Sequence, residues 1–486
     1  MKILSELNPK VVWEYFEDIC QIPRQSKKEE KIIQFLLDFG KKNNLETKRD
    51  EIGNVLISKP ATIGKENIKT VVLQSHIDMV CEANEGTNHN FDTDPIKPVI
   101  DGEWVKATGT TLGADDGIGV AAQMAVLTAT NIEHGPIECL FTVDEETGLT
   151  GAFELQPGFF ESKILINLDS EDEGELFIGC AGGIDTLATF EYEQEQIPQD
   201  HIGFKISVTG LNGGHSGDEI DKGLGNSLKI MNRFLWNAYN EFDLKIGDFE
   251  GGRARNAIPR EAFAHVTVHK EEKTDFVNLF NDFVPAIKAE LANTEPKLEL
   301  SIQEADLPKF AIDEDTQFAL LNGLYACPHG VYAMSIELKG LVETSTNLAS
   351  IKFIENNQIY ITTSQRSSVE TAKYDIASKI ESVFRLAGAS VKQGDGYPGW
   401  KPNTNSEIMK ITEDSYERLF GKKPIVRAIH AGLECGLFLE KYPYLDMISF
   451  GPTIKGAHTP EERINIETNV KFWDLLIDVL KNIPSN

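Results

Sequence analysis

Short apolar segments that end in acidic or histidine side chains constrain the fold of this chain more than any other feature. Four such segments have a length typical of buried strands. They are residues 70–74 before His76 and Asp78, 137–143 before Asp144, Glu145 and Glu146, 164–168 before Asp169, and 447–450 before a loop that carries His458. A fifth segment places Asp115 and Asp116 just before an apolar helical stretch at 117–130. We therefore expect acids and imidazoles to gather at the ends of strands.

The order of these segments predicts an α/β fold. Up to about residue 185, short apolar runs alternate with helical patterns, which favours a mostly parallel sheet flanked by helices. In open sheets of this kind, binding sites lie outside the carboxyl ends of the strands. Because the acidic and histidine residues follow the strands, we expect them to converge at one edge of the sheet.

A different pattern in the middle of the chain predicts a second domain. From about residue 186, apolar and polar residues alternate with a period of two, which is typical of half-exposed strands. The first pattern returns near residue 396. A chain of 486 residues also exceeds the usual limit of one domain, roughly 250–300 residues. We predict a first domain made of residues 1–185 and 396–486, with an α+β domain of residues 186–395 inserted into it.

The negative charge of so many acids at one place must be neutralised by something. Carboxylates within a few ångströms of one another repel and raise one another's pKa, and divalent cations remove that repulsion. A mixed set of histidine and carboxylate ligands suits zinc, cobalt or manganese better than calcium, which prefers oxygen alone. At any single position the ordinary explanation is a helix cap, a turn or a solvated charge. That explanation must account separately for five segments, so we favour a metal site.

Local spacing suggests a division of roles. His76 and Asp78 are two residues apart on an extended segment, so they share one side of it. Asp78 is better suited to hold the second ring nitrogen of His76 than to bind metal itself. Glu145 and Glu146 are adjacent, so one can bind a metal ion while the other acts as a general base.

Composition excludes several partners. The chain has 47 Lys and Arg against 76 Asp and Glu, a formal charge of -29, which disfavours nucleic acid and anionic lipid. We find no apolar span of about 20 residues, so we expect no membrane helix. The first residues lack the apolar core of a signal peptide. The six scattered cysteines are typical of reduced thiols, and a cytoplasmic location follows.

Seven sequence stretches resemble the dinuclear zinc aminopeptidase and carboxypeptidase family, most closely its aminoacyl-histidine dipeptidase subfamily. They are SHIDMV (75–80), TTLGADDGIGVA (110–121), DEETGLTGAFEL (144–155), LINLDSEDEGELFIGCAGG (165–183), LNGGHSGDEI (211–220), GGRARNAIP (251–259) and GPTIKGAHTPEER (451–463). The resemblance therefore spans nearly the whole chain. It implies a catalytic domain with a smaller inserted domain that serves as lid and dimerisation surface.

The resemblance implies two zinc ions per chain, with cobalt or manganese as possible substitutes. His76 and Asp169 would bind one ion. Glu146 and His458 would bind the other, and Asp115 would bridge the two. Asp115 is chosen over Asp116 because the family's bridging aspartate is the first residue of a D-x-K-G-like sequence. In this chain Asp116, Gly117 and Ile118 follow Asp115, so the usual lysine is absent.

The resemblance also implies the catalytic groups. Glu145 would act as the general base towards a water that bridges the two zinc ions, and Asp78 would orient His76. In the inserted domain, His215 would stabilise the oxyanion, often across the interface of a homodimer. Asn256 matches a family element that contacts the carboxylate end of the substrate. Independently of the resemblance, Arg366 at the end of a predicted strand offers a guanidinium suited to a free carboxylate, although a surface or inter-domain ion pair is the alternative.

Two further assignments concern the remaining histidines. His430 would also line the substrate pocket, although it could equally be a packed loop residue. Six histidines lack any motif and are expected to be structural: His89, His134, His201, His265, His269 and His329.

The function implied is a metal-dependent dipeptidase that hydrolyses Xaa-His and other unblocked dipeptides. A tripeptidase, or an amidohydrolase acting on N-acyl amino acids, could use the same metal core. A non-catalytic peptide-binding protein would have no need of Glu145. An acidic calcium-binding protein would have no use for His76 and His458, and the chain lacks the spacing of an EF-hand.

Overall fold

A computed structural model describes residues 2–486, which form two compact units. Unit 1 comprises residues 2–180, 400–428 and 433–486, and unit 2 comprises residues 181–399 and 429–432. Each unit is built on its own large sheet. None of the helices in the described part of the chain combines the length and the apolarity that crossing a bilayer requires.

An eight-stranded sheet forms the centre of unit 1, and its four middle strands run parallel. In sheet order the strands are β1 (Glu46–Arg49), β2 (Val55–Lys59), β6 (Ile137–Thr142), β3 (Val71–His76), β7 (Ile164–Asn167), β23 (Asp446–Ser449), β8 (Glu175–Cys180) and β22 (Ile425–Ile429). Every residue of β3, β6 and β7 is buried, as expected for parallel strands covered on both faces. The predicted α/β fold with a mostly parallel sheet is confirmed.

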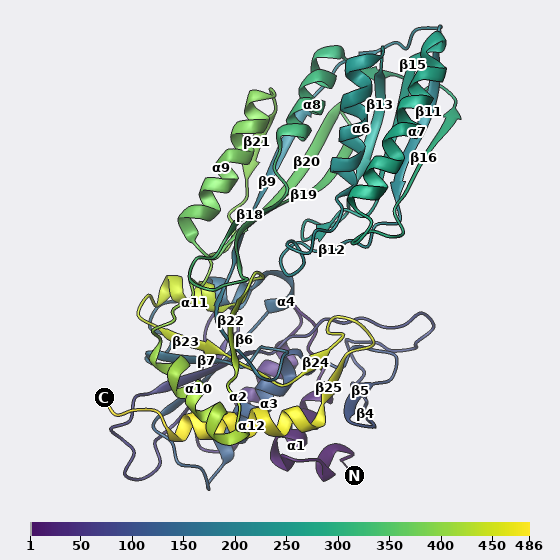
Figure 1. Cartoon of the computed structure of the whole chain (residues 1–486). Helices are drawn as coiled ribbons and strands as arrows, with labels where there is room; N and C mark the ends of the chain where they lie inside the picture. Colours follow the sequence, from purple (N-terminus) through teal and green to yellow (C-terminus); the bar gives the residue numbers. More distant parts are fainter. Residues whose placement is uncertain (1) are drawn as a thin grey trace. The chain divides into compact units, whose positions relative to one another are not determined.

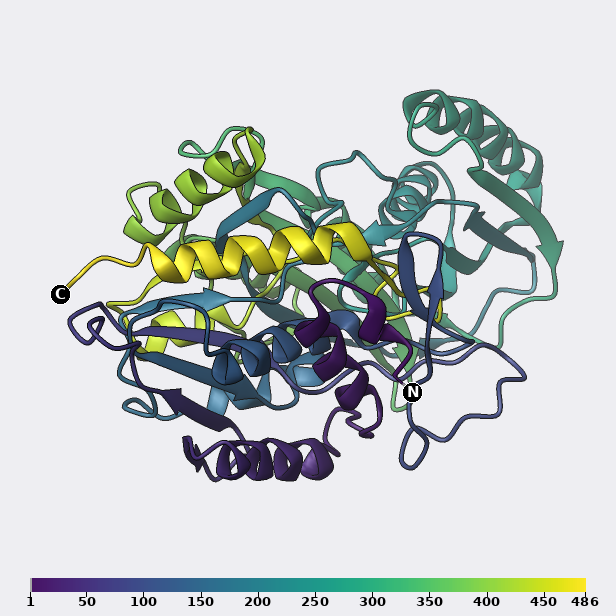
Figure 2. The same cartoon turned by 90° about the horizontal axis from the view of Figure 1, so that it is seen from below.

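Helices cover this sheet, and unit 1 also contains a small separate sheet. The helices are α1 (Lys10–Cys20), α2 (Glu30–Lys42), α3 (Ala114–Thr128), α4 (Glu145–Gly148), α5 (Thr150–Glu154), α10 (Glu407–Phe420), α11 (Cys435–Lys441) and α12 (Ile466–Lys481). Figure 2 shows α12 in yellow, running along unit 1 beside α10. The small sheet has the order β24 (Ile454–Lys455), β25 (Arg463–Asn465), β5 (Trp104–Ala107) and β4 (Pro98–Asp101). The loop between β24 and β25 carries His458.

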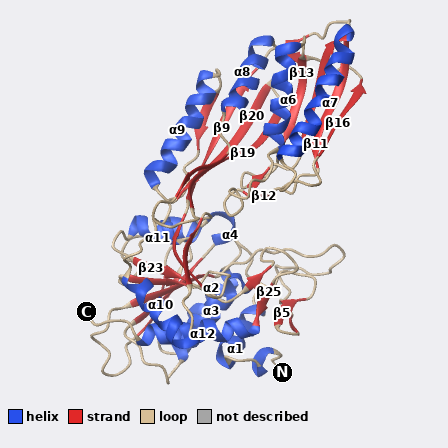
Figure 3. Ribbon diagram, in the orientation of Figure 1, coloured by secondary structure: helices blue, strands red, loops and turns tan. Residues whose placement is uncertain are grey.

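Unit 2 contains a nine-stranded antiparallel sheet with four helices along one face (Figures 1 and 3). The main strand order is β16 (Glu299–Ala305), β11 (His201–Thr209), β15 (Ala262–His269), β13 (Lys245–Gly251), β19 (Val342–Ile354), β20 (Gln358–Ser367), β9 (Gly182–Glu191) and β21 (Ser390–Gln393), with β18 (Gly330–Met334) beside β19. The helices are α6 (Ser227–Glu241), α7 (Lys273–Glu290), α8 (Glu314–Ala326) and α9 (Glu370–Leu386). Short pairs are formed by β10 (Gln194–Glu195) with β17 (Ala311–Ile312) and by β12 (Gly214–His215) with β14 (Ala257–Ile258).

The sheet of unit 2 is made of two βαββαβ repeats. The inner repeat runs β11-α6-β13-β15-α7-β16, and its strands lie in the order β16-β11-β15-β13. The outer repeat runs β9-α8-β19-β20-α9-β21, and its strands lie in the equivalent order β21-β9-β20-β19. The inner repeat is inserted between β9 and α8 of the outer one. The two repeats meet where β13 pairs with β19 in antiparallel fashion.

The chain returns briefly to unit 2 near its end. Residues 429–432 lie in unit 2, although the sequence analysis placed them in the first domain. The physical reason is hydrogen bonding, because the N–H of Ala181 donates to the carbonyl oxygens of Ile429 and Ala431. This short return carries His430 into the second unit.

Candidate metal centre

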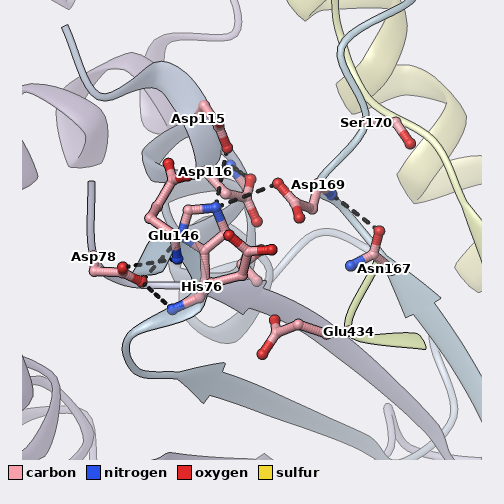
Figure 4. A network of polar contacts seen from close by, with 12 residues as sticks. His76, Asp78, Asp115, Asp116, Glu146, Asn167, Asp169, Ser170 and Glu434 are labelled. Atoms are coloured by element: carbon pink, nitrogen blue, oxygen red, sulfur yellow. Dashed lines mark hydrogen bonds and ion pairs between the residues drawn. The ribbon is translucent and has the colours of Figure 1, made fainter. Parts of the chain in front are cut away.

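The five side chains predicted to bind metal lie together at the carboxyl edge of the unit 1 sheet, four of them labelled in Figure 4. The Nε2 atom of His76 lies 3.0 Å from Oδ1 of Asp115 and 3.4 Å from Oδ1 of Asp169. The Nε2 atom of His458 lies 3.2 Å from Oδ2 of Asp115 and 3.0 Å from Oε2 of Glu146. Each oxygen of Asp115 therefore faces a different histidine.

Local backbone geometry brings these side chains to the edge. His76 is the last residue of β3, and Asp169 follows β7 by two residues. Glu146 lies in α4, which begins after Asp144 turns the chain with a φ of 50°. His458 has a φ of 63° in the loop between β24 and β25.

Asp115 lies at the start of α3, directly after the loop of Gly113. Gly113 has a φ of 71°, and a β-carbon there would lie 2.4 Å from Arg24 and 2.8 Å from Met79. Glycine avoids both the strain and the clash. Asp116, the neighbour of Asp115, is buried and accepts a hydrogen bond from the N–H of Gly119. Asp115 alone of the two faces both histidines.

Asp78 organises the site from beneath. Its buried carboxylate accepts hydrogen bonds from Nδ1 of His76 at 3.2 Å and from Oγ of Ser26 at 2.7 Å. It also accepts the N–H groups of Glu145 at 3.0 Å and Glu146 at 3.2 Å. One side chain thus orients an imidazole and holds the backbone of both glutamates.

Two residues that the sequence analysis missed hold the segment before Asp115. The buried carboxylate of Glu462 accepts the N–H groups of Leu112, Gly113, Ala114 and Asp115 at 2.7–3.3 Å. Arg24, also buried, donates to the carbonyl oxygens of Ile77, Asp78 and Gly113. Glu462 lies in the same sequence motif as His458, and this proximity could have identified it as a residue of the site. Arg24 lies in a segment without a recognised motif, so no sequence pattern indicated that it belongs to the site, although Ser26 beside it also contacts Asp78.

The acids and imidazoles shift one another's pKa strongly. Hydrogen bonds to Asp115 and Glu146 raise the pKa of His458 to about 11. Burial raises the pKa of Asp169 to about 7, against the opposing effect of His76. Burial, and then the negative charges of Asp169 and Glu146, raise the pKa of Glu145 well above its usual range. Without a cation, then, protons must offset the crowded negative charge.

The donor set fits two transition-metal ions. His76, Asp115 and Asp169 form one group, and Asp115, Glu146 and His458 form another, with the donor atoms of each group within 4.8 Å of one another. The two groups share Asp115. In addition, Oε1 of Glu146 is buried without a hydrogen-bond partner, so it has an unused lone pair. Imidazole and carboxylate ligands in sets of this size suit zinc and similar ions.

A third group of acids beside the site has a different character. Glu29, Asp78 and Asp144 are buried with their carboxylate oxygens close together. Glu29 accepts the N–H of Asp144, and Asp144 accepts the hydroxyls of Thr147 and Thr150. Together with the hydrogen bonds to Asp78, these contacts show that the three acids hold the start of α4 in place.

Four predicted residues lie in unit 2. His215 belongs to β12, and the N–H of Ser216 donates to the carbonyl oxygen of Asn256 at 2.8 Å. The Nδ1 atom of His215 accepts the N–H groups of Gly217 and Asp218, both at 3.3 Å. A neutral ring with that acceptor carries its proton on Nε2.

The other two unit 2 residues lie near the loop of His215. A β-carbon on Gly217 would lie 2.5 Å from the carbonyl oxygen of His430 and 3.0 Å from the ring of His215, so the two segments meet there. His430 makes a 2.7 Å hydrogen bond with Ser345, and burial followed by the charge of Arg366 lowers its pKa to about 3. Arg366 donates to the hydroxyl of Tyr397 at 3.0 Å, while its buried Nε has no partner. Asn256 itself is exposed.

Comparison with known proteins agrees with this geometry. Residues 72–482 match the model of peptidase family M20/M25/M40. The chain is 45% identical over 485 residues to the cytosol non-specific dipeptidase of Escherichia coli (strain K12), covering all of both chains. The crystal structure of aminoacylhistidine dipeptidase from Vibrio alginolyticus is 46% identical with a TM-score of 0.92, covering 99% of this chain and 98% of that one. Aminopeptidase PepT from Bacillus cereus, 18% identical with a TM-score of 0.58 and coverage of 98% and 99%, shares the fold.

Proposed function

Because the chain belongs to peptidase family M20/M25/M40 and is a metallopeptidase with a two-metal site, we propose that it hydrolyses Xaa-His and other unblocked dipeptides. The observation that carries the proposal is the carboxylate of Asp115, whose two oxygens face His76 and His458 separately. The full-length similarity to two dipeptidases supports the substrate class.

We propose zinc as the metal. His76 and Asp169 would hold one ion, Glu146 and His458 the other, and Asp115 both. When bound, a pair of such ions supplies a Lewis acid for the carbonyl and lowers the pKa of the attacking water. Cobalt or manganese could replace zinc, because the ligand types suit all three.

Glu145 is the general base in this proposal. Its carboxylate lies beside Glu146, and its own N–H is held by Asp78. The raised pKa of Glu145 suits a group that takes a proton from water near neutral pH and returns it to the leaving amine. Asp78 keeps the ring of His76 oriented throughout, because it accepts from Nδ1 and leaves Nε2 for the metal.

Unit 2 supplies the substrate contacts in this proposal and serves as the lid, with domain boundaries near residues 185 and 395. His215 donates from Nε2 to the oxyanion, which matches the tautomer that its backbone contacts favour. Arg366 offers its guanidinium to the substrate's carboxylate. Asn256 and His430 complete the pocket.

We propose a homodimer in the cytoplasm. The E. coli relative is named a cytosolic enzyme, which supports the location. Within unit 2, β13 and β19 already pair with each other, so their edges are used within one chain. Strand pairing between two chains at this position would therefore have to replace the pairing within one chain.

Metal analysis and a substrate panel test the proposal together. Purified protein should contain two metal ions per chain and release free histidine from an Xaa-His dipeptide. A tripeptide and an N-acetylated amino acid should be cleaved poorly. Removing the metal with a chelator should abolish hydrolysis, and zinc should restore it. Cleavage of only the acetylated compound would identify an amidohydrolase, and unchanged hydrolysis after chelation would overturn the metal mechanism.

A further inference from the structure

A second layer of polar side chains lies beneath the candidate metal ligands within unit 1. Gln74 precedes His76 by two residues on β3, and Asn167 precedes Asp169 by two residues at the end of β7. Side chains two apart along a strand point to the same face. The register pairs Gln74 with Asn167, and Asn167 with Ser449 of β23, so these three residues lie at one level of the sheet.

Hydrogen bonds join this layer into a continuous chain. Nδ2 of Asn167 donates to Oε1 of Gln74 at 2.6 Å. Oδ1 of Asn167 accepts the hydroxyl of Ser449 at 2.5 Å and the N–H of Asp169 at 3.4 Å. Gln74, Asn167 and Ser449 are completely buried. Buried polar networks of this kind hold a site rigid when their members are satisfied.

Glu434, which is labelled in Figure 4, ends the chain of hydrogen bonds on the side of Gln74. It is 1% exposed, and its Oε2 accepts hydrogen bonds from Nε2 of Gln74 at 2.6 Å and from Oγ1 of Thr142 at 2.8 Å. Thr142 is the last residue of β6 and lies level with His76. Glu434 therefore connects the strands that lead to His76, to Asp169 and to the Glu145 loop.

The position of Glu434 in the fold does not explain a carboxylate there. The residue precedes α11, but its side chain makes no capping hydrogen bond to that helix. It takes part in none of the ion pairs found among residues 2–486, and its Oε1 is buried without a partner. Burial raises the pKa of Glu434 to about 8, against the opposing charge of His76, and its unpartnered buried oxygen is a cost to folding. A side chain with that cost calls for a role other than stability.

We propose that Glu434 is a positioning residue for one of the two metal ions. By fixing Gln74, and through it Asn167, Glu434 holds His76 and Asp169 at the spacing that their shared ion requires. Glu146 and His458 are supported elsewhere, by the N–H contact of Glu146 with Asp78 and by the β24–β25 loop. The effect of Glu434 should therefore fall mainly on the His76 and Asp169 ion, because its contact with the other side of the site is limited to Thr142 at the end of β6. The inference rests on the proposed two-metal function.

Two substitutions of Glu434 test whether its hydrogen bonds are what matters: one removes them and the other keeps them. Glu434→Ala removes the acceptor that Gln74 and Thr142 share. It leaves only the longer hydrogen bonds from Gln74 to Thr142 at 3.2 Å and from Thr142 to the carbonyl oxygen of Ser75 at 3.4 Å. Glu434→Gln keeps one oxygen that can accept both donors, and its amide nitrogen takes the place of the unpartnered Oε1. The amide should therefore restore the geometry that alanine loses.

The experiment measures metal affinity directly. Metal-free protein is titrated with Zn²⁺ against a chromophoric chelator, and separately with Co²⁺ while its visible absorption is recorded. The parent protein should bind two ions. Glu434→Ala should bind one ion about 10- to 100-fold more weakly, the usual effect of losing an outer-shell partner, and the other ion within about threefold of the parent value. Glu434→Gln should recover most of that loss, and kcat should fall in Glu434→Ala with little change in KM.

Glu138→Ala is the matched control. Glu138 is another buried carboxylate, but it lies near the start of β6 and accepts the N–H groups of Glu161 and Ser162. Its removal should lower stability without weakening either ion selectively. If Glu434→Ala does not fold, Gln74→Met breaks the same chain of hydrogen bonds and must show the same selective loss.

The outcomes separate the two proposals. Folded Glu434→Ala with both ions bound at parent affinity and with unchanged kcat would overturn the role of Glu434. Equal weakening of both ions would also overturn it, since the proposed effect falls mainly on the His76 and Asp169 ion. A parent protein that fails to bind two ions would instead overturn the two-metal function.

Discussion

Replacing Asp78 by asparagine removes one negative charge and one acceptor oxygen from beneath the metal centre. Oδ1 of Asp78 accepts from His76 and from the N–H of Glu145. Oδ2 accepts from Ser26 and from the N–H of Glu146. Asparagine keeps one acceptor oxygen, and its amide nitrogen must then face two donors.

The size of the effect follows from which donors lose their partner. With the amide oxygen towards His76, the amide nitrogen can donate to the hydroxyl of Ser26, which is free to rotate. The N–H of Glu146 then has no acceptor, and an unsatisfied buried donor costs about 1–3 kcal/mol. Loss of an outer-shell partner typically weakens metal binding by about 10- to 100-fold, which corresponds to roughly 1.4–2.8 kcal/mol. We expect both changes in Asp78→Asn.

The assay compares Asp78→Asn with Asp446→Asn. Asp446 lies at the opposite end of β23 from the site, and its carboxylate accepts the N–H groups of Glu407 and Ile408. Urea unfolding should show a loss of stability in both variants. Competition with a chelator should show weaker Zn²⁺ binding in Asp78→Asn alone. Parent metal affinity in folded Asp78→Asn would refute the reasoning, and equal weakening in Asp446→Asn would reduce it to a general loss of stability.

Three further predictions concern the base, the oxyanion donor and the acid stability of unit 2. Glu145→Gln should retain two metal ions by elemental analysis yet lose about 10²- to 10⁴-fold in kcat, because proton transfer is removed; normal turnover in the metal-replete variant would exclude this base. His215→Ala should lower kcat by about 10²- to 10³-fold with unchanged metal content, and full activity would remove His215 from the mechanism. Burial, followed by the charge of Lys229, lowers the pKa of His329 from 6.5 to about 4. The unfolded chain therefore binds this proton first, so stability should fall as the pH drops from about 6.5 to 4 and stay unaffected above that range. Urea midpoints at pH 7, 5.5 and 4.5 should decline less steeply in His329→Gln, and parallel declines in both proteins would contradict the assignment.

Sequence alone was sufficient to predict the α/β fold of unit 1 and the composition of its polar edge. The runs before His76, Glu145 and Asp169 are short, apolar and buried, and each is followed directly by its acid or imidazole. This works because a strand and the residues after it are contiguous in the chain. Parallel strands then bring those ends together without any further information.

The supporting contacts depended on tertiary structure. Arg24 reaches the carbonyl oxygen of Gly113, 89 residues away, and Glu434 reaches Gln74 across 360 residues. Such pairs leave no periodicity in the sequence, because each partner sits among residues of another element. The repeat of unit 2 could not be recognised in the sequence for a related reason. Its inner copy interrupts the outer one between β9 and α8, so no fixed spacing separates equivalent strands, and only their pairing in the sheet shows that the two halves are alike.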